Sequence, residues 1–166
     1  NAYGQTFKVP EPYIPEVGAR IMSLQEPEKK MSKSDENPNA YISLLDPPDV
    51  IMKKCKRAVT DSENEIKFKE GKDGINNLLT IYSSLTGETI AQVEEKFAGK
   101  GYGDFKAGVA EVVIDSLRPI QERYNDLMNN KDYIEQVYTS SAEKALSISN
   151  RTLQKVYKKI GFVSKL

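Results

Sequence analysis

Apolar residues recur at helical spacing through most of the chain from residue 49 onward. This pattern predicts five helices with one apolar face each, at residues 49–59, 75–87, 88–99, 104–130 and 132–160. Gly87 and Gly99 are expected to end the second and the third of these helices, because glycine readily takes the left-handed conformation after a helix. Pro119 falls inside the fourth helix, where it should kink or break the helix near Leu117.

The N-terminal part of the chain shows a different pattern. Residues 1–19 contain three prolines and two glycines, which predicts an extended connection. The short apolar run at residues 21–24 has the length expected of a buried strand. The polar stretch EPEKKMSKSDENPN follows at residues 26–39 and predicts a loop. Polar and apolar residues alternate at residues 65–69, which suggests a short hairpin arm.

Two residues near the first predicted helix have specific expectations. Asp46 precedes Pro47 and Pro48, so its carboxylate is expected to cap the helix while a proline occupies the first turn. Cys55 lies on the apolar side of the same helix, and a buried thiol is therefore favoured over a reactive one.

Composition narrows the functional classes. The 24 basic residues balance the 24 acidic residues, so any attraction to nucleic acid must come from local segregation of charge. The chain has one cysteine, which excludes an internal disulfide and indicates a reducing compartment. It has no histidine, which excludes a histidine general base and, with the single cysteine, effectively excludes a structural zinc site. The sequence contains no apolar run of membrane-spanning length and no signal-peptide pattern. Its start reads as a mid-chain connector, so we expect a fragment of a larger protein.

Positive charge is concentrated on one side of the last predicted helix. Five basic side chains fall within an arc of about 100°: Lys144, Arg151, Lys155, Lys158 and Lys159. Apolar residues occupy the opposite side, and no acidic residue follows Glu143. Contact with a phosphate backbone requires such a face. A solvated outer face of an amphipathic helix has the same pattern, so both interpretations stay open.

The polar stretch at residues 26–39 carries side chains suited to a polyphosphate. Lys30 and Lys33 are flexible point charges three residues apart, and Ser32 and Ser34 add hydroxyl donors. A loop that follows a buried strand would lie at the carboxyl end of a sheet, where ligands usually bind. It could neutralise the charge that develops as a phosphate leaves. A solvated charged loop has the same composition, so composition does not decide between the two.

The five residues from Lys30 to Ser34 spell KMSKS, which resembles the signature of class I aminoacyl-tRNA synthetases. Further blocks resemble the bacterial tryptophanyl-tRNA synthetase family in the expected order: GARIMSL, DENPNAYISLLD, AVTDSE, GINNLL, GKGYGDFK and LRPIQERY. The similarity extends from about Gly18 to about Ala145. Tyrosyl-tRNA synthetase is the nearest competitor, and the downstream blocks fit it poorly.

The resemblance implies a fold and an activity. The fold would be mainly α, with a helical anticodon-binding region at residues 46–166. The last strand and KMSKS loop of a Rossmann-like class I catalytic domain would precede it, at residues 1–45. The parent enzyme would be a tryptophan–tRNA ligase that uses ATP with Mg²⁺ to form tryptophanyl-adenylate and then charges tRNA(Trp). It would be a cytoplasmic homodimer with no bound zinc and no membrane association.

The resemblance also implies roles for individual residues. Lys30 and Lys33 would be catalytic, and the ATP contacts would come from Ile21, Lys30, Met31, Ser32, Lys33 and Ser34, with Ile21 against adenine. The last helix could pack back on the catalytic domain, which would leave part of its basic face for tRNA. The family's second ATP signature, of the His-Ile-Gly-His type, is absent from this chain, so a C-terminal half that is inactive alone is expected. The alternatives are another class I synthetase, chiefly tyrosyl, and a non-catalytic helical RNA-binding module.

Overall fold

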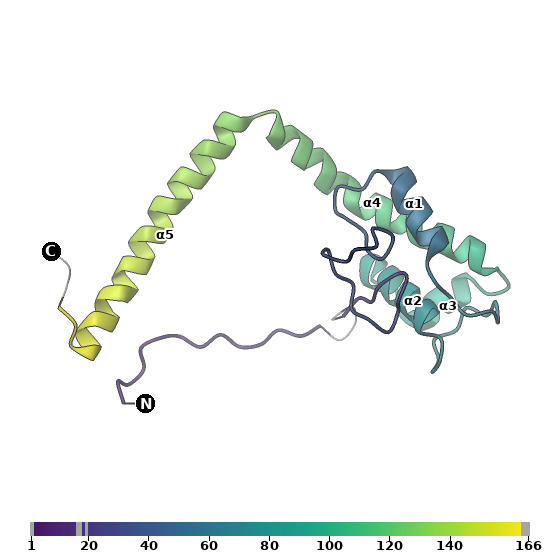
Figure 1. The fold of residues 1–166 in the computed structure, drawn as a ribbon, viewed down its shortest axis with the longest axis horizontal. Coiled ribbons are helices and arrows are strands. Elements are labelled where there is room, and N and C mark those ends of the chain that lie inside the picture. Colours follow the sequence, from purple (N-terminus) through teal and green to yellow (C-terminus); the bar gives the residue numbers. More distant parts are fainter. Residues whose placement is uncertain (1, 16–17, 19, 164–166) are drawn as a thin grey trace. The chain divides into compact units, whose positions relative to one another are not determined.

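Five helices carry the regular structure in the computed structural model, which describes residues 2–15, 18 and 20–163 (Figure 1). They are α1 (Pro48–Arg57), α2 (Asp73–Thr86), α3 (Ile90–Lys96), α4 (Tyr102–Met128) and α5 (Lys131–Ile160). The predicted mainly helical architecture is therefore confirmed. Parts of the predicted connector and of the C-terminal region, at residues 1, 16, 17, 19 and 164–166, lie outside the described residues.

The chain divides into two compact units. One comprises residues 14–123, and the other combines residues 1–13 with residues 124–166. The first unit contains residues from both sides of the boundary predicted between residues 45 and 46. That boundary stays a prediction about the regions of a longer enzyme.

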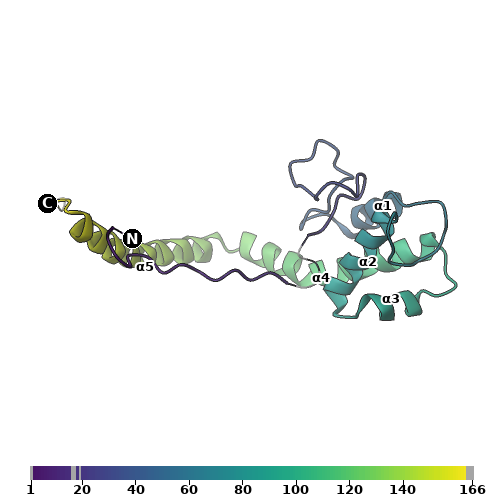
Figure 2. The same cartoon turned by 90° about the horizontal axis from the view of Figure 1, so that it is seen from below.

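Helices α1, α2 and α3 gather around the first half of α4 and enclose the core of the first unit (Figure 2). Its largest fully buried apolar side chains are Leu24, Ile51, Cys55, Ile75, Leu78, Leu79, Val93, Phe105 and Val109. The Phe97 ring packs edge-on against Tyr82 and Phe105, with ring centroids 5.5 and 5.0 Å apart. Burial raises the pKa of the Cys55 thiol to about 11. The expected buried thiol is confirmed.

Local sequence signals place the ends of α2 and α3. Gly87 adopts a φ of 75° after α2, and its N–H donates to the carbonyl of Ser83, as predicted for a helix stop. Helix α3 begins with a capping box in which Thr89 and Gln92 bond each other's backbone N–H groups. It ends at Lys96, three residues before the glycine expected to end it.

Helix α4 continues without interruption across Pro119, so of the predicted kink or break the break does not occur. A proline inside a helix removes one hydrogen bond and costs about 3 kcal/mol. The part of α4 before Pro119 is held by buried residues, the last of them Val113. Just after it, the Gln121 amide donates to the carbonyls of Leu44 and Asp46, at 2.9 Å each. Packing on one side of the proline and these bonds on the other hold the helix together.

Residues 21–24 do not form the predicted strand. Met22 makes an isolated antiparallel bridge to Lys30, and no strand occurs among residues 2–15, 18 and 20–163. The flanking bonds run from the N–H of Ser23 to the carbonyl of Lys29 and from the N–H of Met31 to the carbonyl of Ile21, at 2.8 and 3.0 Å. A strand ladder needs several consecutive pairs, but the chain turns away after Met31 and the pairing stops at one bridge.

Two further local predictions are wrong because side chains found tertiary partners. Residues 65–69 form a loop instead of a hairpin arm, since the N–H of Phe68 donates to Glu94 on α3 at 2.7 Å. Asp46 does not cap α1, whose N-cap is Pro47. Its carboxylate instead accepts from Lys54 Nζ at 2.6 Å within a largely buried ion pair. The proline expected in the first turn is present.

Helix α2 begins where only glycine fits. A Cβ on Gly74 would lie 2.1 Å from the backbone oxygen of Val59, and a backbone atom cannot move aside as a flexible side chain can. This close approach sets α2 against the segment that follows α1.

We therefore expect Gly74→Ala to lower the free energy of unfolding by about 1–3 kcal/mol, the usual cost of overpacking a closely packed site. The matched control is Gly103→Ala in the first turn of α4, where an added Cβ meets nothing within 4 Å. Alanine favours a helix over glycine, so this variant should be neutral or up to about 1 kcal/mol more stable. Chemical denaturation measures both, and equal stability of the two variants would contradict the packing argument.

Candidate functional site

Both ends of the loop at residues 26–39 are tied to the segment at residues 21–24. The bridge between Met22 and Lys30 holds its first part. At its end, the buried Ala40 accepts a hydrogen bond from the N–H of Leu24 at 2.9 Å. The loop therefore projects from a closed base formed with residues 21–24.

Met31 explains why one apolar residue stands at the centre of so polar a loop. Its side chain is partly buried and packs against the core, while Lys30 and Lys33 on either side are exposed. The methionine thus fixes the middle of the loop and leaves the two ammonium groups in solvent. Neither lysine forms a salt bridge with any described residue, so both charges are available to an anionic ligand.

The other residues predicted for this site lie in the same place. The Ser32 and Ser34 hydroxyls are 3.2 Å apart, and the N–H of Ser34 donates to Ser32 Oγ at 3.3 Å. Ile21 is partly buried at the base of the loop, where its carbonyl accepts from Met31. The structure thus brings all six predicted residues into one loop and its base. Their individual roles stay predictions.

The neighbouring lysine, Lys29, differs from the other two. It forms a salt bridge with Glu26 three residues earlier in the loop. The hydrogen bond to Glu26 and the charge of that carboxylate raise the pKa of the Lys29 ammonium. Of the three lysines in the loop, this one is already neutralised within the chain.

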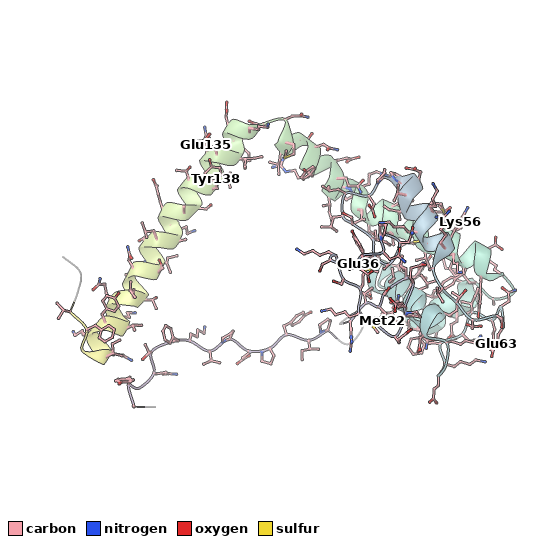
Figure 3. All side chains as sticks on the ribbon, in the orientation of Figure 1. Met22, Glu36, Lys56, Glu63, Glu135 and Tyr138 are labelled. Atoms are coloured by element: carbon pink, nitrogen blue, oxygen red, sulfur yellow. The ribbon has the colours of Figure 1, made fainter. Side chains whose placement is uncertain are left out.

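The sequence interpretation missed one residue that supports the loop. Asn77 on α2 is buried, and its side-chain amide bonds both backbone groups of Met22 (labelled in Figure 3) at 2.8 Å. In the sequence it stands beside Asn76 within GINNLL. Nothing in the helical pattern indicates a different role for the two asparagines, so no sequence signal could have found it.

Helix α5 is continuous over the residues predicted to carry the basic face, so their common arc follows from helix geometry. All five basic side chains are exposed. Lys159 also donates to Thr6 Oγ1 at 3.3 Å and to the carbonyl of Gln5. No described residue of α5 is buried, and apolar side chains such as Tyr138 (Figure 3) and Leu146 are also exposed.

A second cluster of charges surrounds Lys72, whose side chain is 2% exposed. Lys72 Nζ lies 2.9 Å from Glu63 Oε2 and 3.5 Å from Asp61 Oδ1, and it donates to the carbonyl of Glu65 at 3.0 Å. The Tyr102 hydroxyl donates to Asp61 at 2.6 Å. Burial alone would lower the pKa of Lys72, but the bonds to Glu63 and Tyr102 raise it above its ordinary value. The lysine is paired within the chain, so the cluster serves to order the loop before α2.

The part of the chain that the structure describes contains no group of three or more His, Cys, Asp or Glu side chains arranged to hold a metal ion. None of its helices is long and apolar enough to cross a membrane.

Comparison with known proteins identifies the class. The family described as tRNA synthetases class I (W and Y) matches residues 1–118, which is most of the chain. The chain therefore belongs to the class I tRNA synthetases of the tryptophan and tyrosine group. The matched range includes the KMSKS loop and its helical support.

The curated relatives specify the member of this class that the chain is similar to. It is 55% identical to the tryptophan–tRNA ligase of Oceanobacillus iheyensis over 99% of its own length and 50% of that protein's length. It is 51% identical to the tryptophan–tRNA ligase of Bacillus anthracis, over 98% of its own length and 50% of that protein. The resemblance predicted from the sequence is confirmed. The chain spans about half the length of the curated relatives it matches.

Solved structures agree with this assignment. The tryptophanyl-tRNA synthetase of Mycoplasma pneumoniae superimposes with a TM-score of 0.77 and 33% identity, covering 88% of this chain and 46% of that one. The Campylobacter jejuni tryptophanyl-tRNA synthetase, solved with ADP and tryptophan, superimposes with a TM-score of 0.67 and 27% identity over 96% of this chain and 49% of that one.

The Lys72 cluster predicts an acid-dependent loss of stability. Hydrogen bonds from Lys72 and Lys69 lower the pKa of Glu63. Partial burial would raise the pKa of Asp61, but hydrogen bonds from Tyr102 and from the N–H of Glu63 hold that pKa below its usual value. A carboxyl with a lowered folded-state pKa stabilises the fold above its unfolded pKa of about 4, and this contribution is lost as the pH falls through the folded value.

Replacing Lys72 with methionine should therefore lower Tm at pH 7 and flatten the fall of Tm below about pH 4. Lys69→Met is the matched control, because Lys69 contacts two of the same carboxylates, Glu63 and Glu65, from a half-exposed position, where solvent weakens the pairs. Thermal melts over a pH series measure both variants. Lys72 would have no special role if the two variants showed the same pH dependence.

Proposed function

We propose that this chain is the C-terminal part of a tryptophan–tRNA ligase, which activates tryptophan with ATP and Mg²⁺ to tryptophanyl-adenylate and then charges tRNA(Trp). The observation that carries the proposal is the loop itself. Two exposed lysines that form no salt bridge with any described residue flank an anchored methionine, in a chain about half identical to tryptophan–tRNA ligases. Exposed, flexible ammonium groups at this spacing suit a triphosphate.

The proposed roles follow from the chemistry of each side chain. Lys30 and Lys33 are the catalytic residues, and they stabilise the negative charge that develops on the pyrophosphate as it leaves. The hydroxyls of Ser32 and Ser34 and the backbone around Met31 donate hydrogen bonds to phosphate oxygens. Ile21 supplies an apolar contact for adenine at the base of the loop.

In this proposal the lysines act mainly in the transition state. A polar loop held at its base and by one partly buried side chain can close over bound ATP as adenylate forms. Interactions that are completed only then raise the rate of the chemical step without tightening ground-state binding. ATP enters as a substrate together with its Mg²⁺, and the proposal requires no zinc bound to this chain.

The proposal treats this chain as one wall of the ATP site. The relatives are about twice as long, so the remaining ATP contacts and the tryptophan pocket are assigned to a part of the enzyme that this chain does not include. The chain alone is therefore proposed to be inactive. The complete enzyme is proposed to be a cytoplasmic homodimer that does not bind membranes.

A tyrosyl enzyme is the alternative within the same family. The identity of 46–55% to several tryptophan–tRNA ligases favours tryptophan. ATP–pyrophosphate exchange with the full-length enzyme decides between them. Exchange driven by tyrosine and not by tryptophan would overturn the proposed specificity.

The basic face of α5 is proposed to contact tRNA. It consists of Lys144, Arg151, Lys155, Lys158 and Lys159, all of them exposed. Such a face can neutralise backbone phosphates without reading bases. Lys159 is the least available of the five because it already bonds Gln5 and Thr6.

For the loop we expect Lys33→Ala in the full-length enzyme to slow adenylate formation about 10²–10³-fold, the usual effect of removing one charge-stabilising donor. Single-turnover formation of tryptophanyl-adenylate measures the chemical step directly. Lys29→Ala is the matched control, because this lysine is paired with Glu26, and it should change the rate little. An unaltered rate in Lys33→Ala would refute its catalytic role and favour a non-catalytic RNA-binding module.

For α5 we expect Lys155→Glu to weaken tRNA binding and to reduce the slope of log affinity against log salt by about 1, with amino-acid activation unchanged. The control is Lys131→Glu, which makes the same charge change on the same helix outside the basic arc. Filter binding over a salt series measures both variants. Equal losses would show that only net charge matters and that the arc is not a tRNA surface.

A further inference from the structure

Asn77 occupies the position that a neighbouring strand would take beside Met22. Its Oδ1 accepts from the N–H of Met22 and its Nδ2 donates to the carbonyl of Met22, both at 2.8 Å. In an antiparallel ladder, one residue exchanges the same two bonds with the residue opposite it. A side-chain amide from a helix thus replaces a strand at this point.

The other edge of the same segment holds the KMSKS loop. The backbone groups of Ile21 and Ser23 point away from Asn77 and bond Met31 and Lys29, on either side of the bridge to Lys30. Backbone groups alternate between the two edges of an extended segment. Residues 21–23 are therefore held between α2 on one edge and the start of the loop on the other.

The Asn77 amide is fixed in place by its surroundings. Asn77 is 4% exposed, and the adjacent Leu78 and Leu79 on α2 are buried in the core. A buried side-chain amide whose oxygen and nitrogen both bond the backbone of one residue has little freedom to rotate. One edge of Met22 is therefore fixed by the helical core, independently of the loop on its other edge.

We infer that Asn77 is a positioning residue for adenylate formation: through Met22, its amide holds the base of the loop in the register that presents Lys30 and Lys33. The inference rests on the proposed function for the roles of these lysines. Asn77 itself lies on the edge of residues 21–23 opposite the one that bonds Lys29 and Met31, and it acts on the reaction only through these residues.

The adjacent residue is a matched control of the same chemistry. Asn76 accepts from the N–H of Lys69 at 3.1 Å and donates to the carbonyl of Lys69 at 2.8 Å. Asn76 therefore bonds both backbone groups of one residue, as Asn77 does and from the same helix, but that residue, Lys69, belongs to the loop before α2. Replacing either asparagine should lower the stability of the fold, whereas only the replacement of Asn77 should disturb the register of the KMSKS loop.

The first experiment measures the loop in this 166-residue chain, independently of activity. Amide hydrogen exchange should become at least tenfold faster at Met22, Ser23 and Met31 in Asn77→Ala, and it should stay unchanged there in Asn76→Ala. Unchanged exchange at these amides in Asn77→Ala would overturn the inference, whatever the enzyme's activity.

The second experiment measures tryptophan-dependent ATP–pyrophosphate exchange by the full-length enzyme. Asn77→Ala should lower kcat about 10–100-fold with KM for tryptophan unchanged, because a misplacement of about 1 Å at a reacting group has this effect. Asn76→Ala should keep the wild-type kcat. A kcat per folded molecule that is normal in Asn77→Ala would refute the positioning role. Absence of exchange by the unmodified enzyme would instead refute the proposed function.

A third variant separates positioning from simple packing through its pH profile. In Asn77→Asp the ionised carboxylate accepts from Met22 but cannot donate to its carbonyl, whereas the protonated carboxyl can do both. The activity of this variant relative to wild type should therefore rise as the pH is lowered, while that of Asn77→Ala should not. Parallel pH profiles for the two variants would overturn the inference.

Discussion

Two hydrogen bonds from one buried amide determine how the loop joins the rest of the first unit. The side chain of Asn77 satisfies both backbone groups of Met22, and the next backbone groups along the segment hold the start of the loop. A buried backbone group without a partner costs free energy, so this arrangement lets an extended segment lie beside a helix. The helical core thus supports a loop whose own sequence has little tendency to order itself.

Within the loop, apolar anchoring and charge are carried by different side chains. Met31 packs against the core, Lys29 is neutralised by Glu26, and Lys30 and Lys33 are exposed. An exposed lysine keeps its rotamer freedom until an anion binds it. The loop thus combines a fixed base with exposed charges, which suits its proposed role of stabilising charge that develops in a transition state.

Three expectations that depended on short-range signals were confirmed. The left-handed glycine after α2, the proline in the first turn of α1 and the burial of Cys55 follow from backbone preference and helical periodicity within a few residues. Two of the expectations that failed involve a partner outside the local sequence pattern. Asp46 pairs with Lys54 instead of capping α1, and Gln121 supports α4 beyond Pro119 by bonding carbonyls some 75 residues away.

The sequence by itself determined the positions of most helices, the polar character of the loop, and, through the spelling of KMSKS and its neighbouring blocks, the family. These properties are local, because they depend on residues that are close along the chain. Only the tertiary structure decided that residues 21–24 form one bridge instead of a strand. It also decided that Asn77, and not Asn76, holds the base of the KMSKS loop. Two adjacent asparagines on a helix point in directions about 100° apart, so their partners depend on what packs around the helix.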